Sequence, residues 1–164
     1  MSVQVLPITV DHIEGYHRAL DVVARERRYL VFLEAPPVDA VRAFVRDNIE
    51  RGNLQFVAVS DTGEVVGWSD VVPMIRPAQA HRGVFGVGLL PDYRGQGLGT
   101  ELTRVAVEAG RAFGLKRIEL TVRESNAGAI SIYKKAGFEV EGLQRNAVLI
   151  DGIYGNIVSM ARLF

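Results

Sequence analysis

Arg94-Gly95-Gln96-Gly97-Leu98-Gly99-Thr100 is a glycine-rich turn that leads directly into a strongly amphipathic segment. The apolar residues of that segment fall on one side of a helix: Leu98, Leu102, Val105, Ala106, Ala109 and Phe113. The first N–H groups of a helix have no intrahelical acceptor, and the helix dipole adds partial positive charge there. Glycines remove the Cβ atoms that would block close approach, while Arg94 can supply a cation and Thr100 a hydroxyl. The stretch therefore predicts an anion site suited to a pyrophosphate.

The plain alternative is a tight glycine turn that only reverses the chain, because short glycine patterns are weak evidence by themselves. Two known nucleotide loops fit less well. No Lys-Ser or Lys-Thr pair follows a final glycine, which argues against a nucleoside-triphosphate P-loop. The glycines at 95, 97 and 99 do not match G-x-G-x-x-G, and no acidic residue ends the following strand as it does in dinucleotide-binding folds.

The composition is that of an ordinary globular chain. Its 164 residues fit one domain over residues 1–164, and 48% hydrophobic residues are enough for a core. The 19 basic and 19 acidic residues balance, so nothing favours nucleic acid or an anionic membrane as a partner. Cysteine is absent, which suits a reducing cytoplasm and excludes thiolate chemistry. We expect no secretory signal in residues 1–10 and no membrane-spanning segment.

Hydrophobic periodicity and turn residues predict seven strands and four helices. The expected strands are 3–8, 54–60, 64–72, 83–90, 118–122, 143–150 and 154–163, and the expected helices are 11–28, 39–51, 98–113 and 126–137. Their order predicts an α/β (α+β) fold with a central mixed, mostly antiparallel sheet and helices on both faces. The crossover over 84–122 should be parallel and right-handed. Glycines at 86 and 88 indicate a bulge or a close backbone approach.

Two separated motifs resemble those of the general-control-related N-acetyltransferase (GNAT) superfamily. The first is Arg94-x-x-Gly97-x-Gly99, which follows a strand ending in Pro91 and opens a long helix. The second is the segment Asn126-Ala127-Gly128-Ala129-Ile130-Ser131-Ile132-Tyr133-Lys134-Lys135-Ala136-Gly137-Phe138. The element order resembles the family's acyltransferase fold over nearly the whole chain. The ending, Glu141-Gly142 to Asp151-Gly152-Ile153-Tyr154 and Met160, is similar to bacterial members that acetylate free amino acids or related small amines.

The resemblance implies acetyl-CoA as cosubstrate and a set of residues that bind it. The pyrophosphate would be held by the turn, with Arg94 beside the backbone of Gly95, Gln96, Gly97, Leu98, Gly99 and Thr100. The backbone near Val87 and Leu89 would pair with the pantetheine arm, on a strand that bulges and splays from the next one. Asn126 would hydrogen-bond the pantetheine side, and Tyr133 would sit beside the thioester sulfur.

The reaction implied is direct attack of an amine on the acetyl carbonyl, without a covalent enzyme intermediate. Tyr133 could protonate the leaving thiolate as a general acid, a role that contributes about 10²–10⁴-fold in rate. The helix pattern alone favours Tyr133 as a packed aromatic and Asn126 as a plain N-cap, and the motif match reverses that preference for Tyr133. An α-amino group, with a pKa near roughly 7.7–8.0, needs only weak help from a base.

No dedicated base is evident. The strand Val84-Phe85-Gly86-Val87-Gly88-Leu89 carries no carboxylate, although many family members place one there. Glu34, between the first two helices, is the predicted catalytic base, and Asp70 is an outside candidate. Each has a plain alternative, since loop carboxylates are usually solvated. The three histidines, at 12, 17 and 81, are not at metal-ligand spacing, so no metal is expected.

The acceptor remains open at this level. The leading hypothesis is a small-molecule amine, with amino acids among the candidates. Alternatives are the N-terminus of a protein or peptide, and a non-catalytic acetyl-CoA sensor. A groove for a peptide should expose sheet edges and aromatics between the 25–36 loop and the 144–155 hairpin. Tyr29, Phe32 and Tyr154 fit either kind of acceptor. The resemblance also suggests a homodimer.

Overall fold

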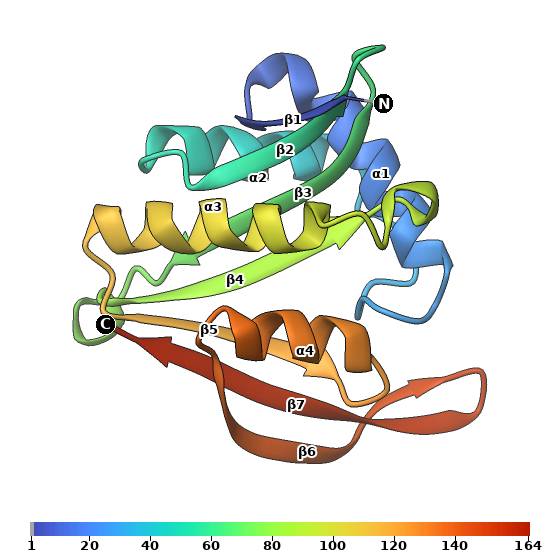
Figure 1. Cartoon of the computed structure of the whole chain (residues 1–164), viewed down its shortest axis with the longest axis vertical. Coiled ribbons are helices and arrows are strands. Elements are labelled where there is room, and N and C mark those ends of the chain that lie inside the picture. Colours follow the sequence, from blue (N-terminus) through green and yellow to red (C-terminus); the bar gives the residue numbers. More distant parts are fainter. Residues whose placement is uncertain (1) are drawn as a thin grey trace.

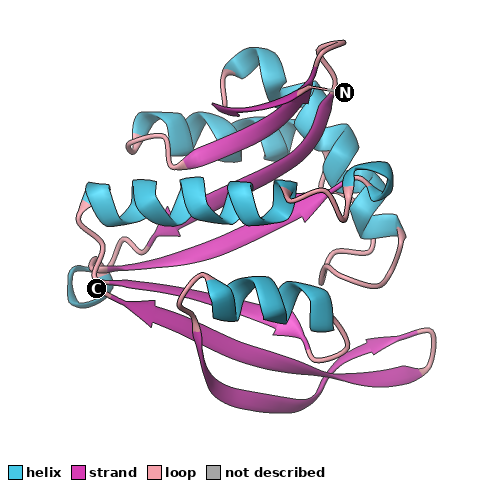
Figure 2. Cartoon of the chain, viewed as in Figure 1, coloured by secondary structure: helices cyan, strands magenta, loops and turns pink. Residues whose placement is uncertain are grey.

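The computed structural model describes residues 2–164 and contains one seven-stranded sheet (Figures 1 and 2). The strand order is β1-β2-β3-β4-β5-β7-β6. The strands are β1 (Val3–Pro7), β2 (Gln55–Ser60), β3 (Val65–Pro73), β4 (Arg82–Leu89), β5 (Arg117–Arg123), β6 (Glu139–Ile150) and β7 (Ile153–Leu163). Neighbouring strands are antiparallel except β4 and β5, which are parallel. The mixed, mostly antiparallel sheet and the parallel crossover predicted from the sequence are confirmed.

Four helices cover the two faces of the sheet. They are α1 (Ile13–Arg25), α2 (Val38–Glu50), α3 (Leu98–Phe113) and α4 (Ala127–Lys135), with three short 3₁₀ turns at Val10–His12, Pro77–Gln79 and Pro91–Tyr93. Helices α1 and α2 lie behind the sheet in Figure 1, and α3 and α4 lie in front of it. Figure 2 shows the same layers coloured by secondary structure. No helix within residues 2–164 is long and apolar enough to cross a membrane.

Amphipathic spacing explains why each helix docks where it does. The inward face of α1 recurs at intervals of three or four residues and is buried: Ile13, Tyr16, Ala19, Leu20, Val23 and Ala24. It forms one core with Trp68 of β3, whose indole meets the Tyr16 ring edge-on at 5.7 Å. The other core lies beneath α3 and α4 and includes Phe85, Tyr133 and Phe138. These two cores therefore lie on opposite faces of the sheet.

The bulge expected in β4 is wrong. Pairing between β3 and β4 runs without a register shift from Gly67–Leu89 to Pro73–Gly83. The irregularities lie instead in β2, at Ala58/Val59, and in β6. A Cβ on Gly88 would stand 2.2 Å from the Trp68 ring, so the second sequence interpretation, a close approach, is the right one. The expected separation from the next strand is present, because β4 pairs with β5 only at Arg82, Gly83 and Val84.

Candidate active site

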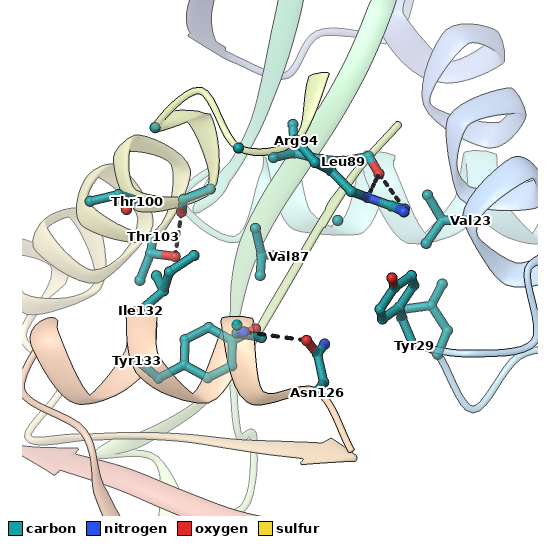
Figure 3. A pocket seen from close by; sticks show the side chains of 17 residues that line it. Val23, Tyr29, Val87, Leu89, Arg94, Thr100, Thr103, Asn126, Ile132 and Tyr133 are labelled. Carbon is teal, nitrogen blue, oxygen red and sulfur yellow. Dashed lines mark hydrogen bonds between the residues drawn. The ribbon is translucent and has the colours of Figure 1, made fainter. Parts of the chain in front are cut away.

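A cavity of about 300 Å³ opens where β4 and β5 diverge (Figure 3). The turn before α3 forms one end and α4 the other, while α1 and the loop after it close one side. Nine of the twelve site residues predicted from the sequence line it: Val87, Leu89, Arg94, Gly95, Gly97, Gly99, Thr100, Asn126 and Tyr133. The fold thus brings together two motifs that are about thirty residues apart in the chain.

The turn end of the cavity presents unpaired backbone N–H groups. Gly97 is the N-cap of α3 with φ 86°, and the first helical hydrogen bond runs from Glu101 N to Gly97 O. The amides of residues 98–100 therefore precede the hydrogen-bonded part of the helix. Gly95 also has a positive φ of 73°, and a Cβ on either glycine would meet only open space. This end of the cavity is an electropositive cradle with room for an anion.

Two predicted members of the turn do not line the cavity. The side chain of Gln96 donates to the carbonyl of Asp92 at 3.0 Å, and Leu98 is only partly buried. Thr103, one turn further along α3, lines the cavity instead and donates from Oγ1 to the Gly99 carbonyl at 2.7 Å. Sequence reasoning missed Thr103 because its local pattern is that of an ordinary helix residue.

Arg94 is held by protein groups rather than standing free. Its guanidinium donates to the Glu26 carboxylate at 2.9 and 2.8 Å and to the Leu89 carbonyl at 3.1 and 2.8 Å. It also lies over the Tyr29 ring, 4.7 Å from the centroid. Its charge is thus balanced by Glu26, and its clearest effect is to fix the loop after α1 against the cavity. The sequence holds no local signal for a partner 68 residues away.

The opposite end of the cavity is formed by α4. Asn126 is the N-cap, and its Oδ1 accepts a hydrogen bond from Ala129 N at 3.2 Å while the side chain lines the cavity. The Tyr133 ring packs edge-on against Phe85 of β4, with centroids 5.8 Å apart. Burial raises the pKa of the Tyr133 hydroxyl well above its usual range. The phenol is therefore protonated at neutral pH and suited to donating a proton.

A second set of contacts closes the cavity from the side. Arg123, at the end of β5, donates to the carbonyls of Arg27 and Leu30 in the loop after α1. Arg27 in turn makes a two-pronged ion pair with Asp151 in the β6–β7 turn, at 3.0 and 2.9 Å. The loop is therefore tied to both the strand and the hairpin, and this closure was not foreseen from the sequence.

The remaining predicted residues lie outside the cavity. Glu34 is exposed and makes one long contact, 3.4 Å to Arg25. Asp70 is buried in β3, on the far side of β4. His12 accepts from Thr9 N, and His17 contacts the Pro36 carbonyl at 2.9 Å. Among residues 2–164, no group of three or more His, Asp or Glu side chains is arranged to hold a metal ion.

Comparison with known proteins assigns the family. The family model described as "Acetyltransferase (GNAT) family" matches residues 20–138, which include the whole cavity turn and α4. The chain belongs to the GNAT acetyltransferase family. It is an acetyl-CoA-dependent N-acetyltransferase, as the sequence motifs predicted.

Individual GNAT relatives agree with this assignment. The L-amino acid N-acetyltransferase AaaT of Escherichia coli K12 is 37% identical over 113 residues, which cover 68% of this chain and 69% of the relative. The spermidine N(1)-acetyltransferase of the same strain is 33% identical over 137 residues, covering 82% and 69%. A GNAT acetyltransferase from Streptococcus pneumoniae has the same fold, with a TM-score of 0.91, 22% identity and coverage of 99% and 100%.

The residues of this GNAT cavity fit acetyl-CoA. The glycine cradle and the start of α3 provide backbone donors for a pyrophosphate. Beyond it, Val87, Leu89 and Ile132 give the cavity an apolar wall suited to an aliphatic arm. The cavity ends on a neutral, protonated phenol. The cavity thus offers a matching surface to each of the anionic, apolar and reactive parts of the coenzyme.

Proposed function

We propose that the protein transfers an acetyl group from acetyl-CoA to the primary amine of a small molecule, with amino acids as the first class to test. The single observation that carries this proposal is the cavity, which runs from the backbone cradle at Gly97 to the hydroxyl of Tyr133. The relatives named for an amino acid and for spermidine support a small amine as the acceptor.

The coenzyme side of the proposal assigns one task to each part of the cavity. The backbone of residues 95–100 binds the pyrophosphate, together with the dipole of α3. The exposed backbone of Val87 and Leu89 pairs with the pantetheine amides, because β5 has turned away from this part of β4. Asn126 donates from its side-chain amide while its Oδ1 caps α4. Arg94 supports the cradle indirectly, through the loop that it fixes.

The chemical step needs one proton to leave the amine and one to reach the sulfur. Bound acetyl-CoA supplies an activated carbonyl carbon and a thiolate leaving group. Tyr133 donates its proton to the departing sulfur, and the burial that raises its pKa keeps that proton in place beforehand. Glu34 as the base stays a prediction, and its exposed position favours a role at the entrance to the acceptor site.

A cellular location and an oligomeric state are also part of the proposal. We propose a cytoplasmic location, because a chain without cysteine suits a reducing compartment. We propose a homodimer, which is supported by exposed apolar side chains on the β6–β7 hairpin: Leu149, Ile153 and Tyr154 are 56%, 72% and 60% exposed.

An acceptor screen tests the proposed function. Purified protein with acetyl-CoA should release free thiol when an amino acid or a polyamine is added, and mass spectrometry should find that amine acetylated. Peptides with free N-termini form the competing arm, because Phe32 and Tyr154 are 48% and 60% exposed beside the loop and the hairpin. Release with peptides alone would replace the small acceptor, and no amine-dependent release would contradict the proposal.

A further inference from the structure

Asp70 is a buried carboxylate that the cavity does not use. It lies in the middle of β3 and is only 9% exposed. Its cross-strand neighbours are Gln55 of β2 and Gly86 of β4. Among residues 2–164, no cation forms an ion pair with it, and burial raises its pKa. An ionisable group is rarely buried without a partner, so this position calls for a functional reason.

The Asp70 carboxylate lies over Gly86 of β4, where the missing side chain leaves a gap on that face of the strand. Gly86 has no side chain, and a Cβ built there would stand 3.4 Å from Asp70 Oδ1. Trp68 fills the corresponding space over Gly88, since a Cβ there would collide with its ring. On the other side, Val84 is 41% exposed, so the face of the sheet opens immediately beyond the gap. Asp70 thus places a carboxylate over a strand that has none of its own.

Asp70 and Tyr133 flank consecutive residues of β4 from opposite faces. Tyr133 packs on Phe85, on the α4 side of the sheet. Asp70 faces Gly86 on the α1 side, as does Trp68 opposite Gly88. Side chains of a strand alternate in direction, so these two groups approach the same short stretch of backbone from its two sides. A proton donor and a proton acceptor so placed suit an acyl transfer in which the amine enters on one face and the thiolate leaves on the other.

We propose that Asp70 accepts the proton that the acceptor amine loses, reaching it through the gap over Gly86. This inference rests on the proposed function. As the new C–N bond forms, one amine proton passes to the Asp70 carboxylate. The C–S bond breaks, and the sulfur takes the proton of Tyr133. Asp70 then releases its proton to solvent and Tyr133 regains one, so the balance is acetyl-CoA plus amine giving amide plus free thiol.

The surroundings of Asp70 suit a group that changes charge near neutral pH. Burial raises its pKa to about 7. From α1, the titratable neighbour is Tyr16, whose own pKa is raised by burial and by the Asp70 charge. From β2 and α2 come only the neutral amides Gln55 and Asn48, which are hydrogen-bonded to each other at 2.9 Å. From β4, Gly86 contributes no side chain, and no cation faces Asp70 in the part of the chain that the structure describes.

The burial of Asp70 also predicts how the stability of the protein depends on pH. The pKa of Asp70 is higher in the folded chain than its ordinary value of 3.8. The folded state therefore binds this proton more tightly and loses stability as pH rises from about 4 to about 7. Removing the charge should relieve that loss. If Asp70 is the proton acceptor, a neutral isostere should lower kcat and raise the melting temperature together. If Asp70 were purely structural, the same replacement would change the melting temperature without lowering kcat.

Asp70→Asn is the decisive variant. We expect kcat at about pH 8 to fall by about 100-fold or more, with the KM for acetyl-CoA within about twofold of wild type. The melting temperature at that pH should rise by a few degrees, on the order of 2–4 °C per kcal/mol relieved. Ser69→Ala is the matched control, because Ser69 is the buried neighbour that faces α3 and its Oγ has no partner. It should leave kcat unchanged.

Gly86→Ala tests the route to the carboxylate without changing its charge. The added methyl would cover Asp70 at 3.4 Å, and Gly86 has no positive φ to strain. We expect kcat/KM for the amine to fall by about tenfold while coenzyme affinity is kept. Glu34→Gln is the rival variant, since Glu34 is the other candidate base.

The possible outcomes distinguish a failure of the proposed function from a failure of the role assigned to Asp70. If wild type acetylates no amine, the proposed function fails and the role of Asp70 fails with it. If wild type is active and Asp70→Asn keeps its kcat, or loses melting temperature without a loss of kcat per folded molecule, only the role of Asp70 is overturned. A large kcat loss in Glu34→Gln with normal turnover in Asp70→Asn would assign the base to Glu34.

Discussion

Replacing Tyr133 with phenylalanine is expected to lower kcat by about 10²–10⁴-fold, because the leaving thiolate loses its proton donor. The KM for acetyl-CoA should change by no more than about twofold, since the variant keeps the ring that packs on Phe85. Because burial raises the pKa of the Tyr133 hydroxyl, wild type should show no loss of activity on the alkaline side that is due to this group. Steady-state kinetics across pH, with thiol release as the signal, provide the measurement.

Tyr93→Phe is the matched control for this result. Tyr93 lies in the 3₁₀ turn before the glycine turn and does not line the cavity. It should keep wild-type kcat. A Tyr133→Phe enzyme with wild-type turnover would remove the proton-donor role, and a parallel rise in the Kd of coenzyme A would indicate a binding role instead.

Replacing Gly97 with aspartate is expected to abolish tight coenzyme binding. The added side chain would project into the open end of the cavity, where the backbone cradle faces a pyrophosphate. A carboxylate there opposes an anionic ligand at short range, so the Kd of coenzyme A should rise by about 100-fold or more, which is about 2.7 kcal/mol. Calorimetric titration of coenzyme A into both proteins measures the change.

Backbone strain needs its own control. Gly97 has φ 86°, so aspartate would also be placed in an unfavourable conformation, at a cost on the order of 1–2 kcal/mol. Gly63 has φ 84° in the β2–β3 turn and equally open surroundings, far along the chain from the cavity. Gly63→Asp should therefore show a similar fall in melting temperature and an unchanged Kd. Equal coenzyme affinity in Gly97→Asp and wild type would contradict the assigned cradle.

Much of the fold follows from local patterns. The amphipathic stripes of α1 and α3 are long and regular, and glycines with positive φ end α3 at Gly114 and α4 at Gly137, as the sequence predicts. The order of elements then leaves few ways to build one sheet. Strand β6 begins at Glu139, four residues before the predicted start at 143, because the residues at its start do not alternate clearly in the sequence.

In the candidate site, too, contiguous motifs could be predicted from the sequence, and contacts between distant residues could not. The turn and α4 are contiguous motifs, so their residues could be named before their cavity was known. The contacts of Arg94 with Glu26, and of Arg27 with Asp151, join residues 68 and 124 apart, and no local pattern encodes them. From the sequence, Glu34 is the predicted base and Asp70 only an outside candidate. The structure separates them by leaving one in solvent and burying the other over Gly86.

Binding of acetyl-CoA in this cavity can be measured through the melting temperature of the protein in coenzyme A. A ligand at about 100 times its Kd stabilises the folded state by about 2.7 kcal/mol. For a chain of this size, each kcal/mol raises the melting temperature by roughly 2–4 °C, so a rise of about 5–10 °C is expected at millimolar coenzyme A. Gly97→Asp should lose that rise. An unchanged melting temperature in wild type would mean that the cavity does not hold the coenzyme.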